Sequence, residues 1–535
     1  MSRPSLFRSM LSFSGGTFLS RILGLVREQA IAYSFGASAA TDAFWVAFRI
    51  PNFLRRLFAE GSFSVAFVPV LTEVKETRPH ADLKELVART AGTLGGVLLV
   101  LTALGVLGAS WLARGFALGA ADEPGRLALT TDLLRVTFPF LFFVSLTALA
   151  GGVLNSFHKF ALPALTPIIL NLCMIAGALW WAPHFDVPIM ALGWAIFAAG
   201  ILQLLVQLPA LRRLDLLALP RWGWRHPDVR RILKLMVPTL FGSSVAQVNL
   251  LLDTLIASFL ITGSQTWLAQ TDRLLEFPLG IFGVALGTVI LPSLSRHHVA
   301  TDREGFAKAL DWGLRTALLI SLPAMLALVL LAEPILATLL QHGRFTAHDV
   351  HMAALSLSAL SFGLPAFALV KVVAPAFYSR QDTRTPVRAG IVAMVANMVL
   401  NVLFVGLLLS LWHRPEDLEG GWFAALDKVP GLHMGLALAS ALAGYLNLAQ
   451  LWLALKRDGV YVSQPGWPRH LARLAVACVA MVAVIVAALW CWPDWSGWSP
   501  LTRVWRLGVV IGAAGATFVA VLLAGGFRLR DLRGI

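Results

Sequence analysis

The sequence predicts an all-α polytopic membrane protein with fourteen transmembrane helices. Of its 535 residues, 58% are hydrophobic and only 13% are charged, and the mean hydropathy is +0.75. A water-soluble protein of this length does not carry so much apolar surface, so a large part of it must face lipid. Apolar runs of about eighteen residues or more recur from end to end, and each is long enough to cross a hydrocarbon core of about 30 Å.

These apolar runs follow one another through short connections, and the first two are the least apolar and the most charged. We expect helices at residues 8–33, 38–70, 90–112, 128–155, 161–182, 188–210, 232–260, 272–295, 313–340, 350–377, 388–411, 432–455, 471–491 and 505–526.

The distribution of Lys and Arg over the connections predicts the orientation. If the N-terminus is cytoplasmic, the inner connections and the two termini carry about four times as many Lys and Arg as the outer connections. Both termini are therefore expected in the cytoplasm. The net charge of +14 is explained by this topology, and no nucleic-acid-binding motif accompanies it. Cys173, Cys478 and Cys491 lack metal-ligand spacing and are interpreted as packing residues.

An internal repeat predicts the domain organisation. The segments Thr41–Leu71 and Thr271–Leu294 both open with Thr-Asp, carry a charged residue two positions before an internal proline, and close on an apolar-Pro-x-Leu sequence. Transporters are commonly duplicated in this way, with the substrate site between the halves. We expect two six-helix lobes at 1–220 and 221–460 around a central cavity, followed by two extra helices at 461–535.

Arginines within the predicted membrane segments indicate the kind of site. They are Arg21, Arg27, Arg49, Arg55, Arg56 and Arg273. A guanidinium at bilayer depth costs about 2.5–3.5 kcal/mol by insertion scales, so it requires an anionic partner or an aqueous cavity. Guanidinium groups also match phosphate and pyrophosphate, which they bind through two parallel hydrogen bonds. The pattern therefore predicts a wet, positively charged chamber that binds an anion.

Nearby carboxylates allow a purely structural interpretation of some arginines. Asp42, Arg49, Arg56 and Glu60 lie at helical spacing on one face, and Arg55 is beside that face. Each arginine there has either a functional role, facing the chamber, or a structural one, pairing with an acid or snorkelling to the interface. For Arg49 and Arg56 the functional and the structural interpretations both stay open. The remaining acids flank the other arginines: Glu28 follows Arg27, and Asp272 and Glu276 share one helical turn with Arg273.

Other polar residues in the apolar runs carry weaker signals. Lys371 is expected near a cavity or snorkelling. Asp253, Asn397 and Asn401 supply one carboxylate and two amide oxygens, which could bind Na⁺ or form ordinary interhelical hydrogen bonds. No nucleotide-binding, hydrolase or metalloprotease motif occurs, so the chain is not expected to be an enzyme or to carry any other cofactor.

Four segments resemble the MurJ (MviN) family, the lipid II flippases of bacterial peptidoglycan synthesis. They are SRILGLVREQAIAYSFGA, TDAFWVAFRIPNFLRRLFAEGSFSVAFVPVLTEVKE, EFPLGIFGVALGTVILPSLS and VKVVAPAFYSRQDTRTPV. The resemblance covers essentially the whole chain. It implies fourteen helices, two lobes around a cationic cavity, and a C-terminal helix pair that forms a groove for a lipid tail.

The resemblance also implies site residues and partners. The essential cavity arginines of the family fall on Arg21, Arg27, Arg55 and Arg273, and its acidic positions fall on Asp42 and Glu276. A sodium site in some relatives corresponds to Asp253 with Asn397 and Asn401, although Asn401 replaces an acid and weakens that site. The implied partners are lipid II, membrane lipids and proteins of cell-wall synthesis, at the bacterial inner membrane.

Two other functions remain open from the sequence. One is export of another undecaprenyl-linked glycan or of a drug, as in the same superfamily; a pump for drug cations should line its cavity with acids and aromatic residues. The other is a membrane scaffold for cell-wall synthesis, which would not need buried charge. The arginines favour translocation of lipid II by alternating access, driven by the membrane potential or an ion gradient.

Overall fold

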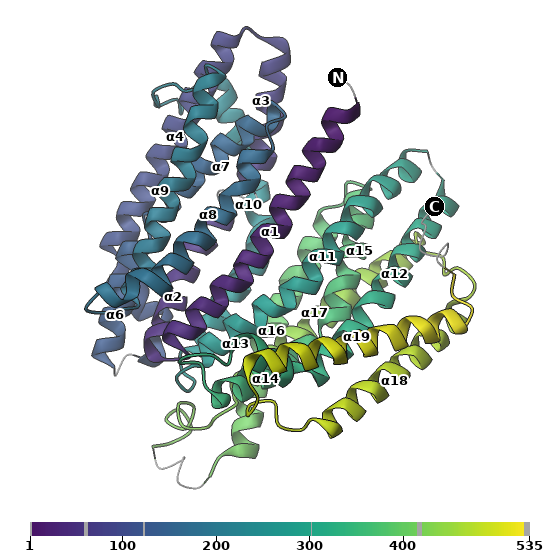
Figure 1. Cartoon of the computed structure of the whole chain (residues 1–535). Helices are drawn as coiled ribbons and strands as arrows, with labels where there is room; N and C mark the ends of the chain where they lie inside the picture. The colour runs from purple at the N-terminus through teal and green to yellow at the C-terminus, as the bar shows by residue number, and fades with distance from the viewer. Residues whose placement is uncertain (1–2, 58–61, 121–122, 301, 415–419, 529–535) are drawn as a thin grey trace. The chain divides into compact units, whose positions relative to one another are not determined.

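The structure is a computed structural model that describes residues 3–57, 62–120, 123–300, 302–414 and 420–528. The described residues form helices and connections, without a strand (Figure 1). Contacts divide the chain into two compact units, Met1–Thr266 and Trp267–Ile535, here called the first and second units.

The first unit contains ten α-helices and three short helical turns among its described residues. They are α1 (Arg3–Phe35), α2 (Ala39–Arg55), α3 (Ser62–Thr77), α4 (His80–Leu107), α5 (Ala109–Phe116), η2 (Leu118–Ala120), α6 (Pro124–Thr137), α7 (Phe140–Ser156), α8 (Ala161–Ala176), η3 (Gly177–Trp181), η4 (Ala182–His184), α9 (Met190–Arg213) and α10 (Pro227–Ala257).

Local signals explain where the helices that carry the candidate site begin. Ser38 precedes α2, and its hydroxyl accepts a hydrogen bond from the backbone N–H of Thr41, which satisfies one of the free donors at the start of the helix. Pro227 begins α10, where its missing N–H costs no helical hydrogen bond. In the packed unit α2 lies against α6 and α10, and α1 lies against α8.

The second unit contains the remaining helices, of which α11 begins three residues before the boundary. They are α11 (Ser264–Val299), α12 (Arg303–Leu330), α13 (Ala332–Leu340), α14 (Ala347–Ser361), α15 (Leu364–Tyr378), α16 (Arg384–Trp412), α17 (His433–Arg457), α18 (Trp467–Cys491) and α19 (Pro500–Ala524).

The last two helices form an antiparallel hairpin, drawn in yellow in Figure 1. Met481 and Ile485 of α18 and Val510 and Ala514 of α19 bury their side chains together with Leu331, which lies between α12 and α13. The hairpin is therefore packed onto the second unit through an apolar core.

The predicted number of fourteen transmembrane helices is not confirmed. In the part of the chain that was described, ten helical spans are long and apolar enough to cross a membrane. Every predicted run overlaps at least one helix, and several runs are divided at a proline or glycine, as at Pro139 between α6 and α7. The runs outside the ten spans are 8–33, 38–70, 232–260 and 272–295, which carry most of the candidate site residues.

The predicted domain boundaries stay predictions. The compact first unit includes α10, beyond the predicted lobe 1–220, and the compact second unit includes the C-terminal hairpin, which was predicted as a separate pair at 461–535. The predicted helix at 38–70 corresponds to α2 and α3, which flank residues 58–61; Glu60 lies outside the described residues.

Candidate functional site

The start of α2 is fixed by a buried carboxylate. Asp42 Oδ2 accepts a hydrogen bond from the backbone N–H of Gly263 at 2.7 Å. Its Oδ1 accepts from the backbone N–H of Thr266 at 2.9 Å and from the Thr266 hydroxyl at 2.6 Å. Arg126 of α6 supplies the opposite charge, with Nη2 3.6 Å from Oδ2. Asp42 therefore ties α2 to α6, to Gly263 in the connection that follows α10, and to Thr266 in the first turn of α11.

The two predicted arginines of α1 lie in different surroundings. Arg27 is buried, forms an ion pair with buried Glu28, and donates from Nη1 to Asn171 Oδ1 of α8 at 3.0 Å. The amide of Asn171 in turn donates to the backbone carbonyl of Ser20 at 3.0 Å. The predicted pairing of Arg27 with Glu28 is present, and Asn171 fixes the guanidinium in place. Arg21 is half-buried.

The arginines of α2 contact α10 and their own helix. Arg49, which is buried, donates from Nη1 to Thr254 Oγ1 at 2.6 Å, and Arg56 donates from Nη1 to Gln247 Oε1 at 3.4 Å. Arg49 and Arg56 are seven residues apart, and their partners Thr254 and Gln247 are also seven residues apart on α10. The predicted face of α2 therefore lies along α10. Arg55 is half-buried and donates from Nε to Asn52 Oδ1 at 2.9 Å.

In the second unit, the predicted basic residues belong to α11 and α15. Arg273 Nη1 lies 3.1 Å from Glu276 Oε2; Arg273 and Asp272 are half-buried, and Glu276 is exposed. Lys371 of α15 is exposed and donates from Nζ to the backbone carbonyl of Leu279 at 3.1 Å. Lys371 thus joins α15 to α11 just after the proline at position 278.

The residues predicted for sodium belong to different units. Asp253 lies on α10 in the first unit and accepts a hydrogen bond on Oδ2 from Asn249 at 3.3 Å. Asn397 and Asn401 are buried on α16 in the second unit, where Asn401 donates to Asn397 Oδ1 at 3.0 Å and Asn397 donates to Ser440 of α17 at 3.1 Å. Among the residues that the structure describes, no group of three or more His, Cys, Asp or Glu could hold a metal ion.

Sequence reasoning missed several partners of the candidate residues. These partners are Arg126 beside Asp42, Asn171 beside Arg27 and Thr254 beside Arg49. Arg126 precedes the predicted apolar run 128–155, yet it is buried at the start of α6. Each partner lies more than eighty residues away along the chain, and no local spacing indicates such a contact. For Asn171 and Thr254, a polar residue inside an apolar run was the one available signal.

Known proteins resemble this chain along most of its length. A family model described as "Lipid II flippase MurJ" matches residues 31–411. A Vibrio cholerae serotype O1 protein named "Probable lipid II flippase MurJ" is 44% identical over 535 residues, covering 99% of this chain and 98% of the relative. A Burkholderia cenocepacia protein named "Lipid II flippase MurJ" is 42% identical over 538 residues, covering 99% of each.

Solved structures agree with this similarity at the level of the fold. One described as "Lipid II flippase MurJ, inward closed conformation" superposes with a TM-score of 0.75 at 26% identity, covering 96% of this chain and 97% of that chain. An inward-facing multidrug resistance MATE family transporter of the MOP superfamily has a TM-score of 0.64 at 12% identity, covering 82% of this chain and 95% of that chain. The second likeness shows the fold alone.

Proposed function

This chain belongs to the MurJ family of lipid II flippases, and on that premise we propose that it carries lipid II from the cytoplasmic to the periplasmic leaflet of the bacterial inner membrane. The observation that carries the proposal is identity of 42–44% to relatives named as lipid II flippases, along essentially the whole chain. Those relatives are named as transporters and not as catalytic enzymes. The ten apolar helical spans suit a multi-pass membrane protein.

The pyrophosphate of lipid II is the group that the arginines would bind. We assign this contact to Arg21, Arg27 and Arg55 in the first unit and to Arg273 in the second. A guanidinium binds a phosphate oxygen pair through two parallel hydrogen bonds, which a lysine cannot reproduce. The Asn171 amide and Glu28 carboxylate hold Arg27 in one orientation, and a fixed donor loses less entropy on binding.

Arg49 and Arg56 are assigned a structural part in the same unit. Each donates to a neutral side chain of α10, at Thr254 and Gln247. These hydrogen bonds support a role in holding α2 against α10 during transport. Asp42, through Arg126, Gly263 and Thr266, supports the beginning of the same helix.

The membrane potential suits the direction of this transport. With both termini in the cytoplasm and a negative interior, outward movement of an anion is favoured by about 2.3 kcal/mol per elementary charge per 100 mV. Alternating access could then proceed without nucleotide hydrolysis. A sodium ion at Asp253, or at Asn397 and Asn401, is the alternative source of coupling, and replacing Na⁺ by K⁺ in the medium would separate the two.

Substitution of the assigned arginines tests the proposal. In cells depleted of other lipid II flippases, Arg27→Ala and Arg273→Ala should each lower the rate of lipid II translocation by about tenfold or more, because a charge-assisted hydrogen bond contributes about 1.5–3 kcal/mol. Arg27→Lys and Arg273→Lys should translocate lipid II at rates between those of the alanine variants and the unsubstituted chain, since lysine keeps the charge but loses the paired hydrogen bonds.

Arg135→Ala is the matched control. Arg135 forms an exposed ion pair with Asp132 on α6, and exposed pairs contribute little. This variant should translocate lipid II at the unsubstituted rate. If Arg27→Ala and Arg273→Ala, present at equal amounts in the membrane, also translocate at that rate, the assignment of the arginines is wrong.

A further inference from the structure

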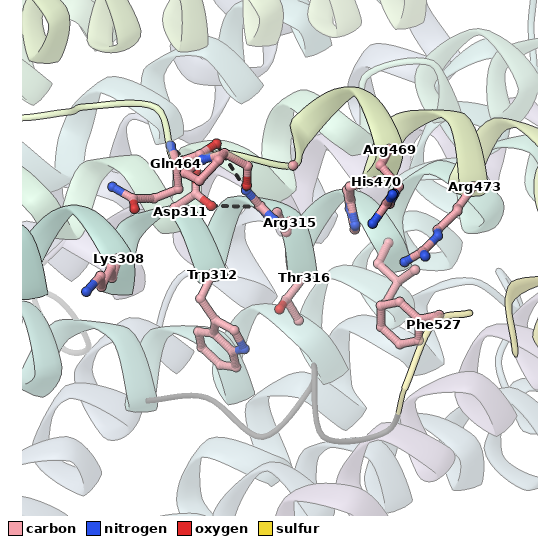
Figure 2. Close-up of a pocket in the computed structure, with 13 residues that line it drawn as sticks. Lys308, Asp311, Trp312, Arg315, Thr316, Gln464, Arg469, His470, Arg473 and Phe527 are labelled. Carbon is pink, nitrogen blue, oxygen red and sulfur yellow. Dashed lines mark hydrogen bonds and ion pairs between the residues drawn. The ribbon is translucent and has the colours of Figure 1, made fainter. Parts of the chain in front are cut away.

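A basic pocket lies within the second unit, outside the proposed lipid II site. It has a volume of about 550 Å³ and is formed by α12, the connection between α17 and α18, the first turns of α18 and Phe527 beyond α19 (Figure 2). Of the described residues that line it, five are basic and one is acidic: Lys308, Arg315, Arg469, His470, Arg473 and Asp311.

The one lining acid is already neutralised by its own contacts. Asp311 is buried and lies 2.7 Å from Arg315 Nε. It also accepts hydrogen bonds from the Tyr461 hydroxyl at 2.9 Å and from Trp467 Nε1 at 2.6 Å. These contacts build one wall of the pocket by tying the connection to α12. Because Asp311 pairs with Arg315, it does not offset the other basic residues.

Two arginines remain with surplus charge. Arg469 and Arg473 lie one turn apart on α18, and Figure 2 shows them on the side of the helix that faces the pocket. Within the described part of the chain, neither forms a hydrogen bond or an ion pair. Lys308, which is exposed, is paired with Glu304 at 2.6 Å. The positive charge of the pocket is therefore concentrated at Arg469 and Arg473.

Apolar side chains form the rest of the lining. Trp312 and Leu319 of α12 and Phe527 complete the pocket. Phe527 follows Gly526, which has φ +83°; a Cβ at that position would lie 3.1 Å from Arg473 Nη2, so the chain turns tightly against this guanidinium. The pocket thus joins cationic groups to an apolar surface, and it lies at the end of two helices that are apolar enough to span the membrane.

We propose that this pocket binds the phosphate headgroup of an anionic membrane phospholipid, with Arg469 and Arg473 on the phosphate and Trp312, Leu319 and Phe527 against the glycerol and the first acyl carbons. Basic clusters next to membrane helices attract anionic headgroups, and each Lys or Arg raises the affinity by about fivefold. A free phosphate ion would use the arginines but gain nothing from the apolar side chains. The occupant is distinct from the transported substrate, so the proposal stands independently of the flippase function.

Retention of phosphatidylglycerol by the purified full chain tests the proposal. The protein is equilibrated in phosphatidylcholine vesicles with and without phosphatidylglycerol, extracted in detergent, and analysed by native mass spectrometry. The unsubstituted chain should retain phosphatidylglycerol. The variant Arg469→Gln/Arg473→Gln should retain it about thirtyfold less, because two cationic groups are lost and each contributes about fivefold, while Arg469→Lys/Arg473→Lys should keep most of it.

A charge-matched control separates the pocket from general surface charge. Arg384→Gln/Arg388→Gln removes the same charge from two exposed arginines at the start of α16 that do not line the pocket, and it should retain phosphatidylglycerol normally. Equal losses in the two glutamine variants, or no retention by the unsubstituted chain, would overturn the proposal. Displacement of the lipid by inorganic phosphate would also overturn it and would identify the pocket as a phosphate site.

Discussion

The carboxylate of Asp42 carries a full set of buried contacts, three hydrogen bonds and the nearby guanidinium of Arg126. A buried charge is tolerated only when it is paired and hydrogen-bonded. Arg126 is also buried, and Asp42 is its buried opposite charge, whereas the exposed carboxylate of Glu123 lies farther away, at 4.0 Å. The pair therefore acts as a structural joint of the first unit.

Asp42→Asn should destabilise the protein by about 3 kcal/mol or more, because it removes the buried carboxylate beside the Arg126 guanidinium and leaves it the exposed carboxylate of Glu123, 4.0 Å away. Thermal unfolding in detergent measures this effect. Asp132→Asn on α6 removes an acid from an exposed pair with Arg135 and should change stability by less than about 1 kcal/mol. Equal effects of the two substitutions would show that the Asp42 contacts do not support the fold.

Tyr461 offers a second test at the level of one side chain. Burial, together with the hydrogen bond to Asp311, raises the pKa of its hydroxyl from 10.0 to about 12. The folded state thus favours the neutral hydroxyl, and its contribution to stability is complete below about pH 10 and is lost as the pH rises through about 12. Tyrosinate absorbance of the unsubstituted chain minus that of Tyr461→Phe should show a midpoint near 12; a midpoint near 10 would contradict the contact.

At the scale of elements, the positions of the helices can be predicted from the sequence far better than the contacts between helices. Apolar runs locate the helices because a lipid-facing segment must satisfy its backbone internally. The face of α2 that carries Arg49 and Arg56 also follows, since helical periodicity places them together. The contacts of Arg27 with Asn171 and of Asp42 with Arg126 depend on tertiary packing, which no local pattern encodes.

The attachment of the C-terminal hairpin depends on a buried arginine. Arg503 of α19 donates from Nη1 to the carbonyl of Ala337 at 2.9 Å, near the C-terminal end of α13, and from Nη2 to the carbonyl of Ser496 at 2.6 Å. A cation at this end satisfies free carbonyls and complements the helix dipole. The contact complements the apolar core formed by α18, α19 and Leu331.

Arg503→Gln should lower the free energy of unfolding by about 2 kcal/mol, because buried carbonyls lose charge-assisted donors. Arg506→Gln is the control on the same helix, since Arg506 stacks on Trp492 and Trp498 and should contribute about 1 kcal/mol. Chemical unfolding in detergent measures the free energy of unfolding of the two variants. A smaller effect at Arg503 than at Arg506 would argue against its part in anchoring the hairpin.

At the scale of the whole molecule, the orientation rests on the Lys and Arg bias of the connections. Cys491 provides a natural probe, because it is exposed at the end of α18, whereas Cys173 and Cys478 are buried. If both termini are cytoplasmic, a membrane-impermeant maleimide should label Cys491 in intact spheroplasts, and Cys491→Ser should abolish that labelling. Labelling that requires permeabilised membranes would reverse the orientation.

The central claim is that this member of the MurJ family moves lipid II across the membrane. The most direct measurement is the amount of lipid II accessible at the outer leaflet of cells in which this chain is the sole lipid II flippase, read out by an externally added enzyme that cleaves exposed lipid II. The account predicts that exposure falls when the chain is depleted and returns when it is resupplied. Exposure that stays constant through depletion would contradict it.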